Sequence, residues 1–159
     1  MREREFTYID KSKYAIGAWT NEPDKIIGID EFSKLPYMVI RANYFGFLYG
    51  YVGVDSTHPF YGKKVSEIEC YVTAHDLTTT LSASYSTLLL PKEEFLEKIE
   101  LDDENELWWI GFDCGHFGET CPFENPNHGK YSDVEDVEEE CLMLSRFLKS
   151  KNEASFLLS

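Results

Sequence analysis

The chain lacks the features that would place it in a membrane or divide it into several domains. None of its apolar runs approaches the roughly 18 residues that a membrane-spanning helix needs. It has no internal repeat, no Pro- or Ser-rich linker and no low-complexity tail. Its charged start, Met1 to Glu5, is followed by no apolar signal core. We therefore expect one domain spanning residues 1–159, no membrane association and a cytoplasmic location in a bacterial host cell.

Basic residues are also scarce, since 15 Lys and Arg stand against 29 Asp and Glu, for a net charge of −14. Such a surface repels nucleic-acid phosphates, so direct nucleic-acid binding is disfavoured. The short basic groups around Lys11, Lys13, Lys63 and Lys64 are too small to reverse this. Acidity of this kind usually serves solubility. The sharper alternative is an acidic protein that occupies the basic nucleic-acid groove of another protein.

Cysteine is sparse and scattered, at positions 70, 114, 121 and 141, which is typical of reduced thiols in a cytosolic chain. The hydrophobic content of 43% and the aromatic content of 15% are high enough for a well-packed core.

Several segments have the patterns of β-strands. Residues 37–41 predict a strand, and residues 45–54 predict a second one that pairs with it as a hairpin. The second strand alternates Phe45, Phe47, Tyr49 and Tyr51, which predicts one aromatic face. Residues 68–75 favour a third strand, and the apolar run at 107–112 favours a buried strand that ends at a glycine-broken turn.

Helical patterns are strongest at the C-terminal end. Ser132 and Glu135 have capping-box spacing, and apolar residues then recur at three- and four-residue steps to about Lys149. Cys141 falls on this apolar stripe, so we expect it to be a core residue. Shorter helical pieces are predicted within residues 26–35 and 91–99. The fold class expected is α+β, a mostly antiparallel sheet of about four or five strands with a C-terminal helix packed on one face.

Three blocks of the sequence resemble a family of uncharacterised bacteriophage and prophage proteins. The first block is Gly50–Val54 with His58 to Gly62, the second is Val72–Thr80 around His75, and the third is Trp108–Glu119. The third block resembles the family's Trp-Trp-x-Gly-Phe-Asp-Cys-x-His-x-Gly-Asp motif, with Glu119 in place of the final aspartate. In the second block, Asp76 and Leu77 stand where relatives have two glycines. The resemblance implies a small phage-encoded accessory protein and supplies no reaction.

Each block contains one histidine, and two acids flank the last of them. Imidazoles and carboxylates that meet in space can hold a divalent metal or perform acid–base catalysis near neutral pH. The candidate catalytic cluster is His58, His75, Asp113, His116 and Glu119. An aromatic floor beside it can bind a nucleotide or nucleoside by stacking on the base. The candidate ligand-binding residues are Tyr49, Tyr51, Trp108 and Trp109.

Each of these residues also has a structural interpretation. Asp113 can cap a turn, His116 can donate to a nearby carbonyl, and one tryptophan of the pair can fill the core while the other faces outward. A Cys114–His116 nucleophile is poorly supported. A zinc site made of Cys114, His116, Cys121 and His128 is a further alternative, although its spacing matches no common zinc motif.

The leading hypothesis is a phage-type accessory protein that binds a small nucleotide-like ligand or a host protein and counteracts a host defence. The alternative is a small hydrolase that uses the histidine–carboxylate cluster, with or without a metal. The sequence leaves the cofactor, the metal and the oligomeric state open.

Overall fold

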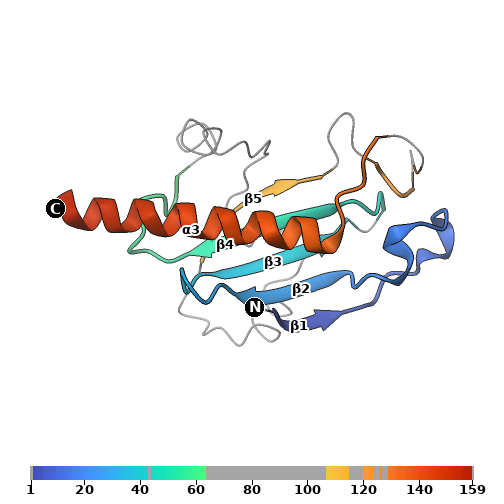
Figure 1. Ribbon diagram of the computed structural model, residues 1–159, viewed down its shortest axis with the longest axis horizontal. Coiled ribbons are helices and arrows are strands. Elements are labelled where there is room, and N and C mark those ends of the chain that lie inside the picture. The colour runs from blue at the N-terminus through green and yellow to red at the C-terminus, as the bar shows by residue number, and fades with distance from the viewer. Residues whose placement is uncertain are drawn as a thin grey trace.

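A computed structural model describes residues 2–42, 44–63, 107–114, 120–123, 126 and 129–158, with the backbone alone at 3, 4, 113 and 153–158. Within these residues, five strands form one antiparallel sheet in the order β1-β2-β3-β4-β5, and one long helix, α3, packs across a face of it (Figure 1). The expected α+β fold class is therefore confirmed. The strands are β1 (Arg2–Phe6), β2 (Lys25–Ile29), β3 (Pro36–Arg41), β4 (Leu48–Val54) and β5 (Trp108–Asp113). Two short 3-10 helices, η1 (Lys11–Lys13) and η2 (Ala18–Asn21), lie between β1 and β2.

The predicted hairpin is confirmed, because β3 and β4 pair with Tyr37 opposite Val52 and Arg41 opposite Leu48. The double-tryptophan strand is also confirmed as β5, at one end of the strand order beside β4. The strand predicted at 68–75 and the helix predicted at 91–99 lie outside the described residues.

The prediction of a helical turn within residues 26–35 is wrong for residues 26–29. They belong to β2, which pairs with β1 on one side and β3 on the other. Ile26 and Ile27 point to opposite faces of the sheet, and both are buried. A strand whose two faces are both buried is apolar at successive positions, so its period-two alternation is hidden.

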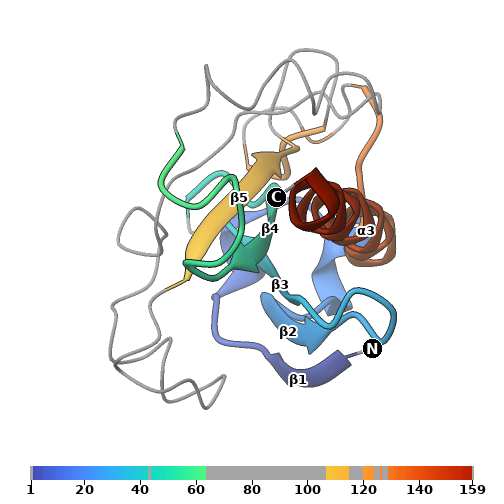
Figure 2. The same cartoon turned by 90° about the vertical axis from the view of Figure 1, so that its left-hand side faces the viewer.

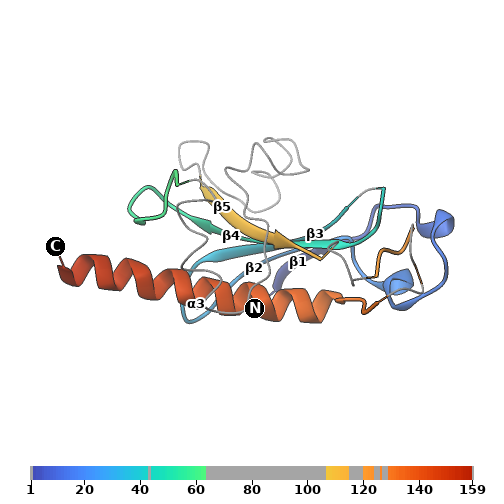
Figure 3. The ribbon, with the colours of Figure 1, turned by 90° about the horizontal axis from the view of Figure 1, so that it is seen from above.

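Each face of the sheet has its own apolar core, since successive side chains of a strand point to opposite faces. The helix face carries Val39, Val52 and Ile110 against Val137 and Leu144 of α3. The opposite face, which we call the far face, is built from a second buried group: Ile27, Met38, Ile40, Tyr51, Leu107 and Trp109. Figures 2 and 3 show α3 lying along only one side of the sheet.

Helix α3 (Val134–Leu158) begins one residue later than the capping box predicts and ends well beyond Lys149. The reciprocal cap is made by Asp133 and Asp136: the Asp136 amide donates to Asp133 Oδ1 at 2.8 Å, and the Asp133 amide donates to Asp136 Oδ2 at 3.2 Å. Cys141 is a fully buried core residue, as expected. The C-terminal turns of α3 extend past the strands (Figure 3). Within the described residues, no helix is both long and apolar enough to cross a membrane.

Candidate functional site

His58, the one candidate histidine within the described residues, uses both of its ring nitrogens in contacts to the main chain. Nε2 lies 2.6 Å from the Leu148 carbonyl oxygen, and Nδ1 accepts from the Phe60 amide at 3.0 Å. Since Nδ1 accepts, the proton belongs on Nε2, which donates to Leu148. Burial lowers the pKa of His58 and favours this neutral ring. The contacts show that His58 connects the loop after β4 to α3.

The sheet register separates His58 from Asp113. Val54, at the end of β4 that leads to His58, pairs with Trp108, whereas Asp113 pairs with Tyr49 at the other end of the strands. Neighbouring antiparallel strands run in opposite directions, so the segments that follow them lie at opposite ends of the strands. His58 and Asp113 are therefore not brought together as the cluster requires. His75, His116, Glu119 and the Asp113 side chain lie outside the described residues, so a site made of these four residues stays a prediction.

The four aromatic residues expected to floor a pocket are divided between the two faces. Tyr49, Tyr51 and Trp109 lie with the far-face core, where Trp109 and Tyr51 are buried and Tyr49 is partly exposed. Trp108 packs against the helix-face core, and its Nε1 donates to the Lys63 carbonyl at 3.0 Å. The expectation that adjacent tryptophans face opposite sides is confirmed, and only Tyr49 of the four is positioned on the far face with an exposed surface.

Tyr49 belongs to a continuous series of aromatic rings that leads from β4 into the β3–β4 turn. We call this series the aromatic row: Tyr44, Phe45, Phe47, Tyr49 and Tyr51. Consecutive ring centroids are 4.8, 6.1, 5.2 and 6.1 Å apart. Exposure rises along it from 5% at Tyr51 to 37% at Phe45 and 57% at Tyr44. The period-two aromatic pattern of the sequence therefore predicts most of this surface.

The turn that carries the exposed end of the aromatic row is fixed on several sides. Arg41 Nη1 donates to the Gly46 carbonyl at 2.8 Å, and the Phe123 amide donates to the Phe45 carbonyl at 3.0 Å. Gly46 has a φ of +86°, and a Cβ there would lie 2.9 Å from Pro122 Cβ, so glycine is required. The two exposed rings therefore stand on a well-defined backbone.

Behind this turn lies a group of buried and partly buried charged and polar side chains, which we call the polar hub: Lys11, Glu22, Asp24, Arg41 and Tyr131. Asp24 Oδ1 lies 2.7 Å from Lys11 Nζ and 3.1 Å from Arg41 Nε. Glu22 Oε1 accepts from Tyr131 Oη at 2.6 Å. Burial by itself would raise the pKa of Asp24, but the hydrogen bonds from Lys11 and from two backbone amides outweigh it and lower that pKa.

The polar hub joins the N-terminal segment to the helix. Glu22 Oε2 accepts from the Val134 amide at 2.9 Å, at the first turn of α3, where amides lack partners within the helix. Arg41 Nη1 also bonds Tyr131 Oη at 2.9 Å. These residues are far apart in the sequence, so no local pattern predicts the hub.

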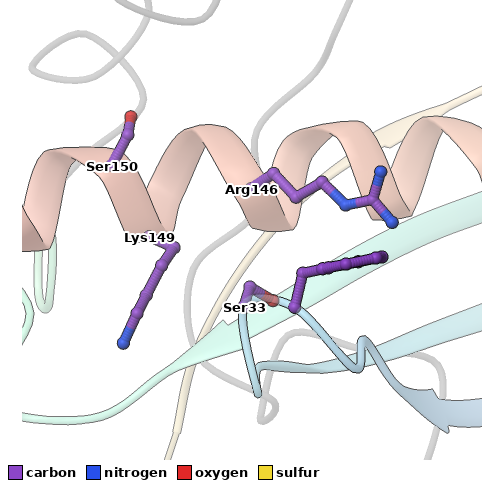
Figure 4. Close-up of a pocket in the computed structure, with 5 residues that line it drawn as sticks. Ser33, Arg146, Lys149 and Ser150 are labelled. Atoms are coloured by element: carbon purple, nitrogen blue, oxygen red, sulfur yellow. The ribbon is translucent and has the colours of Figure 1, made fainter.

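A shallow pocket of about 130 Å³ lies at the other end of the sheet, between the β2–β3 turn and α3 (Figure 4). We call it the cationic pocket, and it is lined by Phe32, Ser33, Arg146, Lys149 and Ser150. The Arg146 guanidinium lies over the Phe32 ring, 4.6 Å from its centroid. Nothing in the sequence analysis pointed to this pocket.

Among the described residues, no three His, Cys, Asp or Glu side chains are grouped closely enough to hold a metal ion. Cys114 and Cys121 are buried thiols. Their proposed partners in the zinc alternative, His116 and His128, lie outside the described residues, so that alternative is untested.

Comparisons with family models, curated proteins and solved structures gave no match to this chain. The resemblance to phage proteins therefore stays a prediction from the sequence.

Proposed function

We propose that this protein is a phage-type accessory protein that binds a host protein through its aromatic row. The observation that carries the proposal is the set of partly exposed rings at the outer end of the row, Tyr44, Phe45, Phe47 and Tyr49. Clustered, exposed aromatic side chains are typical of protein-binding surfaces.

The length of the aromatic row favours a protein over a nucleotide-like ligand. Its rings follow one another at centroid spacings of 4.8 to 6.1 Å, so the exposed part is longer than one stacked base can cover. A single-stranded nucleic acid could stack along such a row, but the net charge of −14 opposes its phosphates. A partner with an apolar patch inside a basic surface fits both the rings and the charge.

Rigidity supports the same proposal. Arg41 and Phe123 hold the turn through the carbonyls of Gly46 and Phe45. A surface that is ordered before binding loses less conformational entropy when the partner arrives. Occupying a host protein in this way is one means by which a phage protein counteracts a host defence.

A pull-down from bacterial lysate tests the proposal with a Tyr44→Ser, Phe45→Ser double variant. Both side chains are exposed, so we expect the variant to fold, which circular dichroism and thermal unfolding would check. The matched control is Ile16→Ser, which removes an apolar side chain that is 94% exposed outside the row.

The wild type and the Ile16→Ser control should each recover one host protein in stoichiometric amount, and the double variant should recover at least tenfold less. Equal recovery by all three proteins would refute a role for the row. Failure of the wild type to recover any stoichiometric partner would refute binding of a host protein.

A further inference from the structure

The cationic pocket lies near Asp30 at the β2–β3 turn, away from the aromatic row at the β3–β4 turn. In Figure 4 Arg146 and Lys149 extend from α3 on either side of Ser33. Phe32 forms one wall of the pocket, and 68% of this residue is exposed. The Ser150 hydroxyl points away from Ser33 in Figure 4 and donates to the Phe147 carbonyl at 2.6 Å. The pocket thus combines two cationic side chains with an aromatic surface.

Asp30 fixes the position of Arg146. This buried carboxylate accepts from the Ser33 amide at 3.1 Å and from Ser145 Oγ at 2.9 Å. Burial by itself would raise the pKa of Asp30, but the hydrogen bonds from Arg146 and Ser33 outweigh it and hold that pKa well below its usual range. Asp30 is therefore an anion that orients the guanidinium.

Arg146 reaches Asp30 with only part of its guanidinium. Nε and Nη2 lie 3.4 and 3.3 Å from the two Asp30 oxygens. Within the described part of the chain, Nη1 of Arg146 has no hydrogen-bond partner. Arginine can donate five N–H groups in a planar fork, so a second anion can still be bound.

Lys149 supplies the uncompensated charge. Its ammonium group makes no ion pair or hydrogen bond with any described residue, and it lines the same pocket as Arg146. Asp30 balances Arg146, so Lys149 leaves the pocket locally positive in a chain whose net charge is −14. A concave site of this kind concentrates small anions.

We propose that the cationic pocket binds a nucleoside monophosphate. The phosphate would bind at the Lys149 ammonium, which points away from the Arg146 guanidinium in Figure 4, because an ammonium group is a donor that phosphate groups prefer. The planar base would stack on the exposed part of the Phe32 ring. This site is separate from the aromatic row and does not depend on a host protein.

Titration of the folded protein with AMP, inorganic phosphate and adenosine, followed by calorimetry and by amide chemical shifts, tests the proposal. AMP should bind at least tenfold more tightly than either inorganic phosphate or adenosine, because only AMP offers both the anion and the ring. Shifts should centre on residues 32–33 and 146–150. Equal affinity for AMP and inorganic phosphate, or shifts centred elsewhere, would overturn the assignment.

Two variants sharpen the test. Lys149→Gln should weaken AMP binding about tenfold, by loss of one charge-assisted contact. Lys130→Gln makes the same change of charge at an exposed site outside the pocket and should bind AMP as the wild type does. Phe32→Ala should reduce the affinity for AMP to that for inorganic phosphate. Unchanged AMP binding by Lys149→Gln would refute the site.

The Tyr44→Ser, Phe45→Ser double variant should retain AMP binding in full. Loss of host-protein recovery and loss of AMP binding therefore have separate readouts, and either proposal can fail alone.

Discussion

The Asp24→Ala substitution is the most direct test of the polar hub. Asp24 and Arg41 are fully buried, and their side chains are 3.1 Å apart at Oδ1 and Nε. Asp24 Oδ1 also pairs with Lys11 Nζ at 2.7 Å, while Oδ2 accepts from the Tyr8 and Ile9 amides at 2.7 Å each. Truncation to alanine removes all of these acceptors at once.

The expected loss of stability is about 3–5 kcal/mol, the usual cost of removing one partner from a buried ion pair. Arg41 then keeps Glu22, 3.3 Å away, as a counter-ion, but it loses its buried acceptor, and Lys11 and two backbone amides lose theirs as well. For a chain of this length, that corresponds to a fall in melting temperature of roughly 6–20 °C. Urea unfolding, followed by tryptophan fluorescence and by circular dichroism, would measure the change in the free energy of unfolding.

Glu139→Ala is the control, since it removes a carboxylate of the same sign from an exposed position on α3. Its free energy of unfolding should stay within about 0.5 kcal/mol of the wild type. A loss below about 1 kcal/mol in Asp24→Ala would refute the view that the hub holds the N-terminal segment to β3.

The wild type and Asp24→Ala also test the pKa of Asp24. The pKa is lowered in the folded state, so the carboxylate contributes its full stability above the unfolded value of about 3.9 and loses it as the pH falls through the lower folded value. The stability difference between the wild type and Asp24→Ala should therefore be constant from pH 7 to pH 5 and should shrink below about pH 4. A difference that persists unchanged at pH 2 would contradict the lowered pKa.

Two further substitutions test other parts of the fold. His58→Gln should cost about 1–3 kcal/mol by loosening the contact to the Leu148 carbonyl. Burial lowers the pKa of His58, so the neutral ring contributes its full stability to the folded state above about pH 6.5 and loses it as the pH falls below that value. The free energy of unfolding of His58→Gln should therefore change less between pH 7 and pH 5 than that of the wild type. An unchanged pH profile would argue against a buried neutral ring. Gly111→Ala should cost more than about 2 kcal/mol, because its Cβ would collide with the Gly50 carbonyl and with the Tyr51 ring. Gly62→Ala is the control, because a Cβ at this position meets open space and only the φ of +76° opposes it. It should lower the free energy of unfolding by about 1 kcal/mol. An equal loss of stability in both variants would contradict the packing argument.

Elements with a clear period were predictable. The β3–β4 hairpin and the double-tryptophan strand follow from apolar runs bounded by turn residues, and α3 follows from apolar residues at three- and four-residue steps. The start of α3 was misplaced by one residue, because Ser132 and Asp133 are both good caps and only the backbone geometry selects Asp133.

Strands β1 and β2 were not predicted. β1 is rich in charge, and its Arg2 is stabilised by Glu138 of α3, where Nε lies 2.9 Å from Oε1. β2 is apolar at consecutive positions because it is buried on both faces. In both strands, the conformation depends on partners that are distant in the sequence.

Of the two proposed binding surfaces, one was predictable from the sequence and the other was not. Alternating aromatics predicted the aromatic row, since a strand places every second side chain on one face. The cationic pocket is different: Phe32 belongs to a turn, and Arg146 and Lys149 belong to a helix more than a hundred positions later. Their meeting required α3 to pack across the β2–β3 turn.

The sequence alone determined the fold class, the hairpin, the C-terminal helix and the acidic character of the surface, because each depends on composition or on short periodic patterns. The tertiary structure alone decided that His58 bonds the main chain of α3, that the polar hub connects three distant segments, and that two cations share a pocket with Phe32. Those contacts depend on strand register and on helix position, which are set by packing across the whole chain rather than by any local run of residues.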